Sequence, residues 1–298
     1  MKRLLFSVLF FFVFTENIFS QDTIKASPKV DLSKIAMASQ SDSYVTLPFD
    51  IGNLEPLIFE ANISPSFVIR ERKDSRLMGM LTAQIIIRMY NEESLPVRTP
   101  SYMPQISVYY LLGDKYADKK NTIFGKLAHH SNGQDGDFYD ENGDINLKSG
   151  NFSTNFIELG YIHTSYSKKL NAVKFFKTSL EMHPQSWMFE EIRGMYSGLR
   201  WHNTFSAFKI PVGNTDTEKR AQISLKLETM IMMDDINEWS TFEPDRFNAS
   251  LTFYYHPKFL EEIGFFVQYY HGMDYYNIYF MHQIDVVRFG IMTDILRF

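Results

Sequence analysis

Hydrophobic and polar residues alternate along most of this chain with a period of two. One clear run has Ile223, Leu225 and Leu227 on one side, interleaved with Ser224 and Lys226. A second run, from Phe247 to Tyr255, repeats the pattern. Because successive side chains of a β-strand point to opposite faces, this alternation predicts strands that have one apolar and one polar face.

About twelve segments of this kind follow one another. They span 44–52, 58–70, 76–90, 103–114, 121–131, 153–166, 170–183, 197–210, 219–233, 246–256, 261–272 and 282–298. A soluble sandwich would also alternate, with its apolar residues inward. Segments of about ten residues or more, in an even number, favour instead an all-β transmembrane antiparallel barrel of about 12 strands whose apolar side chains face lipid.

The start of the chain differs from the rest. Residues 1–20 have the pattern of a secretory signal peptide, with Lys2 and Arg3 before an apolar stretch and the small Ser20 at its end. After it, no run of about 18 apolar residues remains for a transmembrane helix. We expect a polar periplasmic lead-in over 21–43, to which we assign no fold, and a barrel over 44–298.

Composition narrows the functional classes. The chain has no cysteine, which excludes disulfides, thiolate metal sites and cysteine nucleophiles. Its net charge of −5 gives no electrostatic footprint for nucleic acid, so no nucleic-acid partner is expected. Aromatic residues make up 16% of the chain, which suits a barrel with aromatic belts at its strand ends.

Candidate chemistry lies in the fifth and sixth predicted strands. His129 and Ser131 are two residues apart, so they share one strand face, which is also the apolar face of that segment. Asn155 lies on the apolar face near the start of the next segment. If the two strands form an antiparallel pair, all three side chains meet at the same rim of the barrel.

These three residue types can form an acyl-transfer site. A serine hydroxyl is a poor nucleophile unless a base takes its proton, and a histidine needs a third group that fixes its orientation. Ser131 would be the nucleophile, His129 the base and Asn155 the orienting residue. The rival orienting residue is Asn151, and the alternative interpretation of the histidine is a simple interface residue. His130 is expected on the lumen side, without a catalytic role.

Three ordered motifs resemble the outer membrane phospholipase A family. His129-His130-Ser131-Asn132-Gly133 is similar to its His-x-Ser-Asn-Gly signature, and Ser153-Thr154-Asn155 to its Ser-x-Asn. Upstream, Glu92-Glu93-Ser94-Leu95-Pro96-Val97-Arg98 resembles its Glu-Glu-Ser-x-Pro-x-Arg segment. The resemblance implies a 12-stranded barrel and a calcium-dependent phospholipase A1/A2, a carboxylic ester hydrolase that acts on glycerophospholipids.

The resemblance also implies partners and ligands. The oxyanion would be held by the backbone N–H of Gly133 together with a calcium-bound water. The Ca²⁺ ligands would be Ser94 from the facing subunit of an active homodimer, the carbonyl of Gln134, and Asn151. Gln134 stands where the family commonly has arginine, and Asn151 replaces a serine, so an amide oxygen takes the place of a hydroxyl.

The order of the predicted strands also predicts which side of the membrane the candidate site faces. With a periplasmic N-terminus, the loop after Ser131 faces outward, which predicts an outer membrane protein with its site towards the outer leaflet. Asp135, Asp137, Asp140, Glu141 and Asp144 in that loop are interpreted as solvated residues, with calcium attraction as the alternative. The competing functions are an inactive barrel that acts as a porin or structural protein, and an esterase of lipopolysaccharide.

Overall fold

The structure is a computed structural model of the 298-residue chain, and it describes residues 30–71, 75–212, 221–260 and 262–293. The predicted signal peptide, residues 21–29 of the predicted lead-in and residues 294–298 of the last predicted strand lie outside the described residues.

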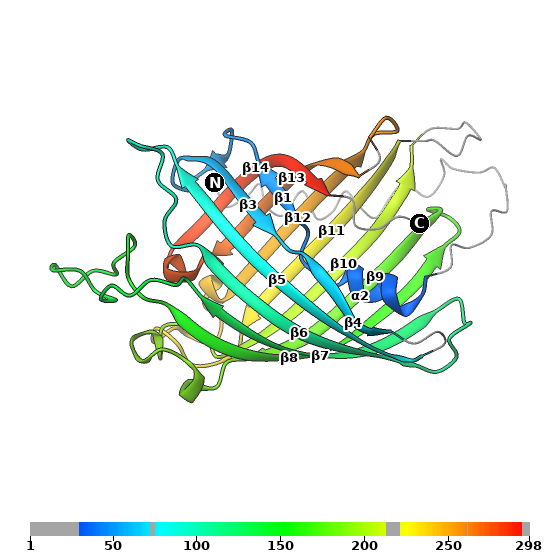
Figure 1. Cartoon of the computed structure of the whole chain (residues 1–298), viewed down its shortest axis with the longest axis horizontal. Helices are drawn as coiled ribbons and strands as arrows, with labels where there is room; N and C mark the ends of the chain where they lie inside the picture. Colours follow the sequence, from blue (N-terminus) through cyan, green and yellow to red (C-terminus); the bar gives the residue numbers. More distant parts are fainter. Residues whose placement is uncertain (1–29, 72–74, 213–220, 261, 294–298) are drawn as a thin grey trace.

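The described residues form one antiparallel sheet. Its strands are β1 (Tyr44–Thr46), β2 (Ile51–Gly52), β3 (Leu57–Ile63), β4 (Ser66–Glu71), β5 (Leu77–Tyr90), β6 (Ser101–Leu112), β7 (Lys120–Ser131), β8 (Ser153–Ser167), β9 (Ala172–Met182), β10 (Leu199–Pro211), β11 (Gln222–Met232), β12 (Phe247–His256), β13 (Ile263–Met273) and β14 (Gln283–Thr293). Each strand from β5 to β14 pairs with its neighbours in sequence order (Figure 1).

The sheet closes into a barrel. β1 pairs with β14 on one side and with β3 on the other. Because β1 and β2 share the edge of β14, and β3 and β4 share the edge of β5, these fourteen described strands occupy twelve positions around the barrel. The predicted barrel of twelve strands is confirmed. The single strand predicted at 58–70 is divided near Pro65, which lacks an N–H for a ladder hydrogen bond.

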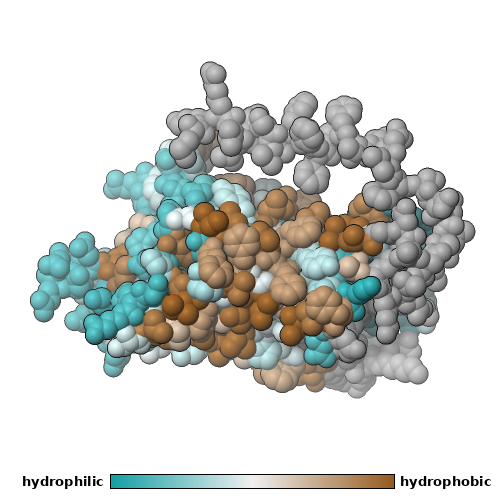
Figure 2. Space-filling view, turned by 90° about the horizontal axis from the view of Figure 1, so that it is seen from above, coloured by the Kyte–Doolittle hydropathy of each residue, from teal (hydrophilic) through white to brown (hydrophobic). Residues whose placement is uncertain are grey.

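The period of two places alternate residues inside and outside the barrel. On β7, Ile123 and Leu127 are exposed on the outer wall, while Phe124 and Ala128 are buried on the lumen side. Figure 2 shows the result on one face of the molecule, where a hydrophobic area lies beside a hydrophilic end. An apolar outer band with a polar interior is the surface pattern of a transmembrane barrel.

The lumen contains paired charges. Lys126 Nζ lies 2.6 Å from Glu158 Oε2, and Lys177 Nζ lies 2.9 Å from Glu158 Oε1. Arg88 contacts Glu60 at 2.7 Å and Asp274 at 2.6 Å. Buried charges of this kind require partners, and here neighbouring strands supply most of them, while the loop 274–282 supplies Asp274.

The two ends of the barrel differ. The connections 91–100, 132–152, 183–198, 233–246 and 274–282 gather at one end, called here the long-loop end, at the left of Figure 1. The fully described connections 113–119 and 168–171 lie at the other, the short-turn end. Longer loops face the cell exterior in barrels of this kind, so the long-loop end corresponds to the predicted exterior.

Described residues occupy part of the lumen at both of its ends. Helix α2 (Leu32–Ala38) lies inside the barrel near the short-turn end, where Leu32 and Ile35 pack against lumen-facing residues such as Met78 and Phe175 (Figure 1). At the long-loop end the connections fold inward and bury an apolar cluster, called here the apolar cap. It includes Phe138, Phe152, Met188, Ile192, Tyr196, Tyr276, Ile278, Tyr279 and Phe280.

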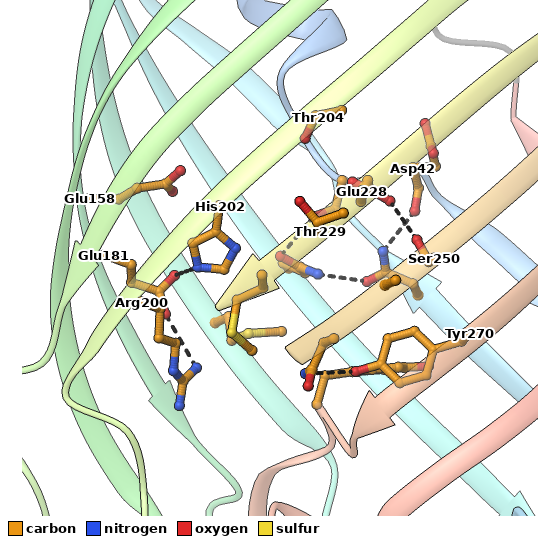
Figure 3. Close-up of a pocket in the computed structure, with 18 of the residues that line it drawn as sticks. Asp42, Glu158, Glu181, Arg200, His202, Thr204, Glu228, Thr229, Ser250 and Tyr270 are labelled. Carbon is orange, nitrogen blue, oxygen red and sulfur yellow. Dashed lines mark hydrogen bonds and ion pairs between the residues drawn. The ribbon is translucent and has the colours of Figure 1, made fainter. Parts of the chain in front are cut away.

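A cavity of about 430 Å³ lies in the lumen between α2 and the apolar cap, lined by charged and polar residues (Figure 3). None of the helices in the described part of the chain is long and apolar enough to span a membrane.

Candidate active site

His129 and Asn155 face each other across β7 and β8. They are register partners, and His129 Nδ1 lies 2.9 Å from Asn155 Oδ1. An amide oxygen can only accept a hydrogen bond, so this contact assigns the proton to Nδ1 of the imidazole. The lone pair of Nε2 is then available to accept a proton from a hydroxyl. The expected meeting of these two side chains is present.

Ser131 lies two residues after His129 on the same outer face, opposite Ser153 of β8 and Tyr102 of β6. No hydrogen bond joins Ser131 to His129 among the described residues. Side chains at this spacing on a strand are separated by about 6.6 Å at their Cα atoms, so rotation of the side chains or one water can bridge them. Contacts of this type commonly tighten only when a substrate is bound.

The amide of Asn155 is held from a second side. Its Nδ2 donates to the backbone carbonyl of Trp187 at 3.3 Å. Trp187 ends the short helix η1 (Gln185–Trp187), and the segment that follows is fastened to β8 because Phe189 N–H donates to the carbonyl of Ser153 at 2.9 Å. With the nitrogen directed to Trp187, the amide oxygen faces His129. The contact therefore selects the orientation of Asn155 that a histidine N–H requires.

Asn132 organises the turn that follows the serine. Its side chain is fully buried, donates to the carbonyl of Gly150 at 2.7 Å, and accepts from the N–H groups of Phe152 at 3.0 Å and Gln134 at 3.2 Å. Gly133 between them has φ +64°, a left-handed conformation that glycine adopts without strain. None of the hydrogen bonds within the described residues uses the Gly133 N–H. That donor is free for an oxyanion.

The predicted calcium ligands are oxygen donors on two loops. Asn132 brings 132–134 and 150–152 together, so the carbonyl of Gln134 and the side chain of Asn151 belong to one small turn system. The described residues contain no group of three or more His, Cys, Asp or Glu that could hold a metal. Carbonyl, amide and hydroxyl oxygens are nevertheless suitable ligands for Ca²⁺, so the residues present fit this ion.

Ser94 lies on a different loop from these two residues. The loop is pinned by an ion pair in which Arg98 Nη1 donates to Glu92 Oε1 at 2.8 Å, and by the N–H of Tyr90, which donates to the carbonyl of Pro96 at 3.0 Å. Ser94 itself is exposed, with φ +67°. An exposed serine at the apex of a pinned loop is accessible to a second molecule.

Two other sequence expectations can be placed. His130 is buried on the lumen side, 3.2 Å from Ser101 Oγ and edge-on to the ring of Phe152. Asn151, the rival of Asn155, lies in the loop and has no contact with His129 among the described hydrogen bonds.

Sequence reasoning missed two groups. Asn132 had a signal, because it is part of the His-Ser-Asn-Gly run, but no role was assigned to it. The carbonyl of Trp187 had no signal in the sequence, since every residue carries a backbone carbonyl. The contact of this carbonyl with Asn155 depends on how the loop 183–198 folds.

The fold and the outer-wall site define a class: a closed β-barrel of the outer-membrane type whose polar candidate site lies on the lipid-facing side. The sequence matches no protein-family model and no curated protein sequence.

Among solved structures, the chain has the fold of outer membrane phospholipase A. The Escherichia coli protein aligns over 91% of this chain and 99% of its own, with a TM-score of 0.60 and 12% identity. The Salmonella typhi protein, a dimer with bound calcium, aligns over 90% of this chain and 100% of its own, with a TM-score of 0.61 and 13% identity. The family resemblance indicated by the motifs is confirmed at the level of the fold.

Proposed function

We propose that this chain is a calcium-dependent phospholipase A1/A2 of the outer membrane that hydrolyses acyl esters of glycerophospholipids. The observation that carries the proposal is the bond of 2.9 Å between His129 and Asn155 on the outer wall, with Ser131 on the same face. Polar side chains on a lipid-facing wall are costly and call for a functional reason. A phospholipid in the membrane would reach this site without entering the barrel.

Ser131 Oγ attacks the ester carbonyl while His129 Nε2 takes its proton. Asn155 keeps Nδ1 protonated and supports the imidazolium that forms. His129 then returns the proton to the leaving alcohol, and water, activated by the same histidine, releases the fatty acid from Ser131. The N–H of Gly133 stabilises the oxyanion, a contribution that is often the largest in acyl transfer.

Calcium and a second subunit belong to the same proposal. Gln134 and Asn151 would hold Ca²⁺, with Ser94 supplied by the facing subunit, and the ion would contribute positive charge near the developing oxyanion. The outer wall beside Ser131 carries exposed apolar residues of β6, β7 and β8, including Ile106, Val108, Ile123, Leu127 and Leu159. A two-fold dimer requires one self-complementary patch, and this patch adjoins the site. The Salmonella typhi relative is a dimer with calcium.

A second observation supports a role for an asparagine. One of the aligned E. coli structures, with a TM-score of 0.59 and 13% identity, is of an active-site mutant of that protein in which asparagine is replaced by alanine. The porin alternative is less well supported, because α2 and the apolar cap occupy part of the described lumen at both ends. The site would face the outer leaflet, at the long-loop end.

The test is fatty-acid release from mixed phospholipid and detergent micelles by the refolded protein. We expect release that needs calcium and that disappears in Ser131→Ala and on chelation. His130→Gln is the matched control, since this neighbour faces the lumen. Absence of release from a folded wild-type barrel in the presence of calcium would refute the proposal.

A further inference from the structure

The hairpin β7–β8 contains the same arrangement twice. Asn121-x-Ile123 precedes His129-x-Ser131 on β7, and Asn155-x-Ile157 precedes His163-x-Ser165 on β8. Each residue of the second run lies 34 positions after its counterpart, since 155 − 121, 163 − 129 and 165 − 131 are all 34. The candidate site already described uses the histidine and serine of the first run and the asparagine of the second. The other three residues form its complement.

The register brings this second set together in the same way. Asn121 pairs with His163 as Asn155 pairs with His129, and His163 Nδ1 lies 2.8 Å from Asn121 Oδ1, against 2.9 Å in the first pair. A local two-fold axis of the hairpin thus relates the pair His163–Asn121 to the pair His129–Asn155. By the same argument as before, the contact puts the proton on Nδ1 of His163 and leaves Nε2 to accept one.

The second set also lies on the outer wall, at the other edge of the membrane. His163 and Ser165 share the face of the exposed Leu159, and both are partly exposed. Eight residues separate Asn121 from His129, which is roughly 27 Å along the strand and about 20 Å along the barrel axis at the usual tilt. Since the apolar band of such barrels is about 25 Å tall, one His–Asn pair lies near each interface.

The asparagine of the second set is also oriented by a second contact. Tyr161 donates its hydroxyl to Asn121 Oδ1 at 2.7 Å. At the first site the corresponding help comes from the Trp187 carbonyl, which accepts from the nitrogen of Asn155. The Trp187 carbonyl can only accept, so it fixes the amide of Asn155, whereas the hydroxyl of Tyr161 contacts the same atom of Asn121 as His163 does and holds that amide in place beside the histidine.

The surroundings differ in charge. Position 168, which corresponds to Gln134 of the predicted calcium turn, is a lysine; Lys169 follows it, and Lys119 lies in the connection 113–119 at the same rim, just before the pair Lys120–Thr164. All three are exposed. Ser167 takes the place of Gly133. Fixed positive charge at this rim can stabilise an oxyanion and attract an anionic headgroup. At the first site, Ca²⁺ would supply the positive charge.

We propose that Ser165, His163 and Asn121 form a second acyl-transfer site, which takes acyl esters of anionic amphiphiles at the short-turn rim and needs no calcium. Ser165 Oγ bonds to the ester carbonyl carbon as its proton passes to His163 Nε2. The bond from that carbon to the alcohol oxygen then breaks, and the alcohol leaves with the proton. Water then bonds to the acyl carbon as one of its protons passes to His163 Nε2. The bond from that carbon to Ser165 Oγ breaks, Oγ takes the proton back from His163, and the carboxylic acid leaves. The reaction requires nothing from Ser131.

The test is labelling of the refolded full-length barrel by an alkyl fluorophosphonate in chelator, with the modified serine located by mass spectrometry. The serine oxygen bonds to phosphorus and fluoride leaves. We expect labelled Ser165 in the wild type and in Ser131→Ala, and at least tenfold less in His163→Ala. In chelator, hydrolysis of phosphatidylglycerol should exceed that of phosphatidylcholine and should be lost in Ser165→Ala.

The outcomes separate the two sites. Label on Ser165 without activity at Ser131 would support this inference and count against the proposed calcium-dependent function. Label on Ser131 alone, or on neither serine of a correctly folded barrel, would overturn it. Tyr161→Phe gives a finer check, since it leaves the nucleophile and base in place and should slow labelling of Ser165 but not of Ser131.

Discussion

Asn132 and Phe152 are bound to one another twice. The N–H of Asn132 donates to the carbonyl of Phe152 at 3.1 Å, and the N–H of Phe152 donates to Asn132 Oδ1 at 3.0 Å. This double contact closes the base of the loop that separates β7 from β8. The residue after Asn132 is the candidate oxyanion donor Gly133, so the position of that donor depends on a buried amide.

Asn132→Ala should therefore reduce activity as well as loop order. The substitution leaves the buried carbonyl of Gly150 and the N–H of Phe152 without partners, each at a cost of about 1–3 kcal/mol. We expect fatty-acid release to fall more than about tenfold, because small displacements of a catalytic donor are expensive. Hydrogen exchange over 133–151 measures the loosening. Asn142→Ala, an exposed change in the same loop, is the control, and an equal loss in both variants would contradict this role.

Trp187→Gly should act through Asn155. Freeing the backbone of η1 lets the Trp187 carbonyl move away from the Asn155 amide, so kcat should fall by about tenfold with little change in KM. In an Asn155→Ala background the same change should have almost no further effect, because the two act as one unit. Trp201→Ala is the matched control, since Trp201 is equally exposed but lies on β10. Additive losses in the double variant would show that Trp187 has a separate role.

Asn151 should set the calcium requirement. Asn151→Ala removes one oxygen ligand, so the calcium concentration for half-maximal activity should rise by about tenfold or more. Asn151→Asp keeps an oxygen at that position and should restore much of the affinity. Gln134→Ala should change little, because its backbone carbonyl is the expected ligand. The measurement is a calcium titration of fatty-acid release, and an unchanged titration for Asn151→Ala would remove this residue from the ligand set.

Ile35→Ala should loosen α2 inside the barrel. Ile35 is fully buried among lumen-facing residues, and truncation at such a site costs about 2–5 kcal/mol. Limited proteolysis of the folded barrel should then cut within 30–43 at least several-fold faster than in the wild type. Ser33→Ala, on the same helix outside the apolar contact, should behave as the wild type. Equal protection in both variants would mean that other contacts, such as Lys226 with Asp42, hold the segment.

The sequence predicts the barrel and the meeting of the site residues for one reason. Strand periodicity fixes which face each side chain occupies, and a hairpin then places His129 opposite Asn155 once the two strands are aligned. The faces of Lys126 and Glu158 follow from the same rule. These features depend on local pattern and one strand pairing, which the residues themselves encode.

Other features depend on long-range folding and could not be predicted in this way. The Trp187 carbonyl reaches Asn155 only after the loop 183–198 has packed into the apolar cap. Helix α2 is short, and its burial depends on lumen residues from strands far along the chain, so residues 30–43 gave no clear pattern. The repeat of His129-x-Ser131 as His163-x-Ser165 is visible in the sequence. Only the strand pairing shows that His163 lies opposite Asn121, as His129 lies opposite Asn155.

The alternation along β7 divides two properties of the protein between interleaved positions. Residues such as His129 and Ser131 border the lipid, whereas Lys126 and His130 border the buried interior. A scan of single alanine substitutions through this strand should therefore give alternating effects. Substitutions at odd-numbered residues should change turnover, and those at even-numbered residues should change the yield of refolding. The outer-wall site can therefore change by substitution at one set of positions while the other set continues to hold the barrel together.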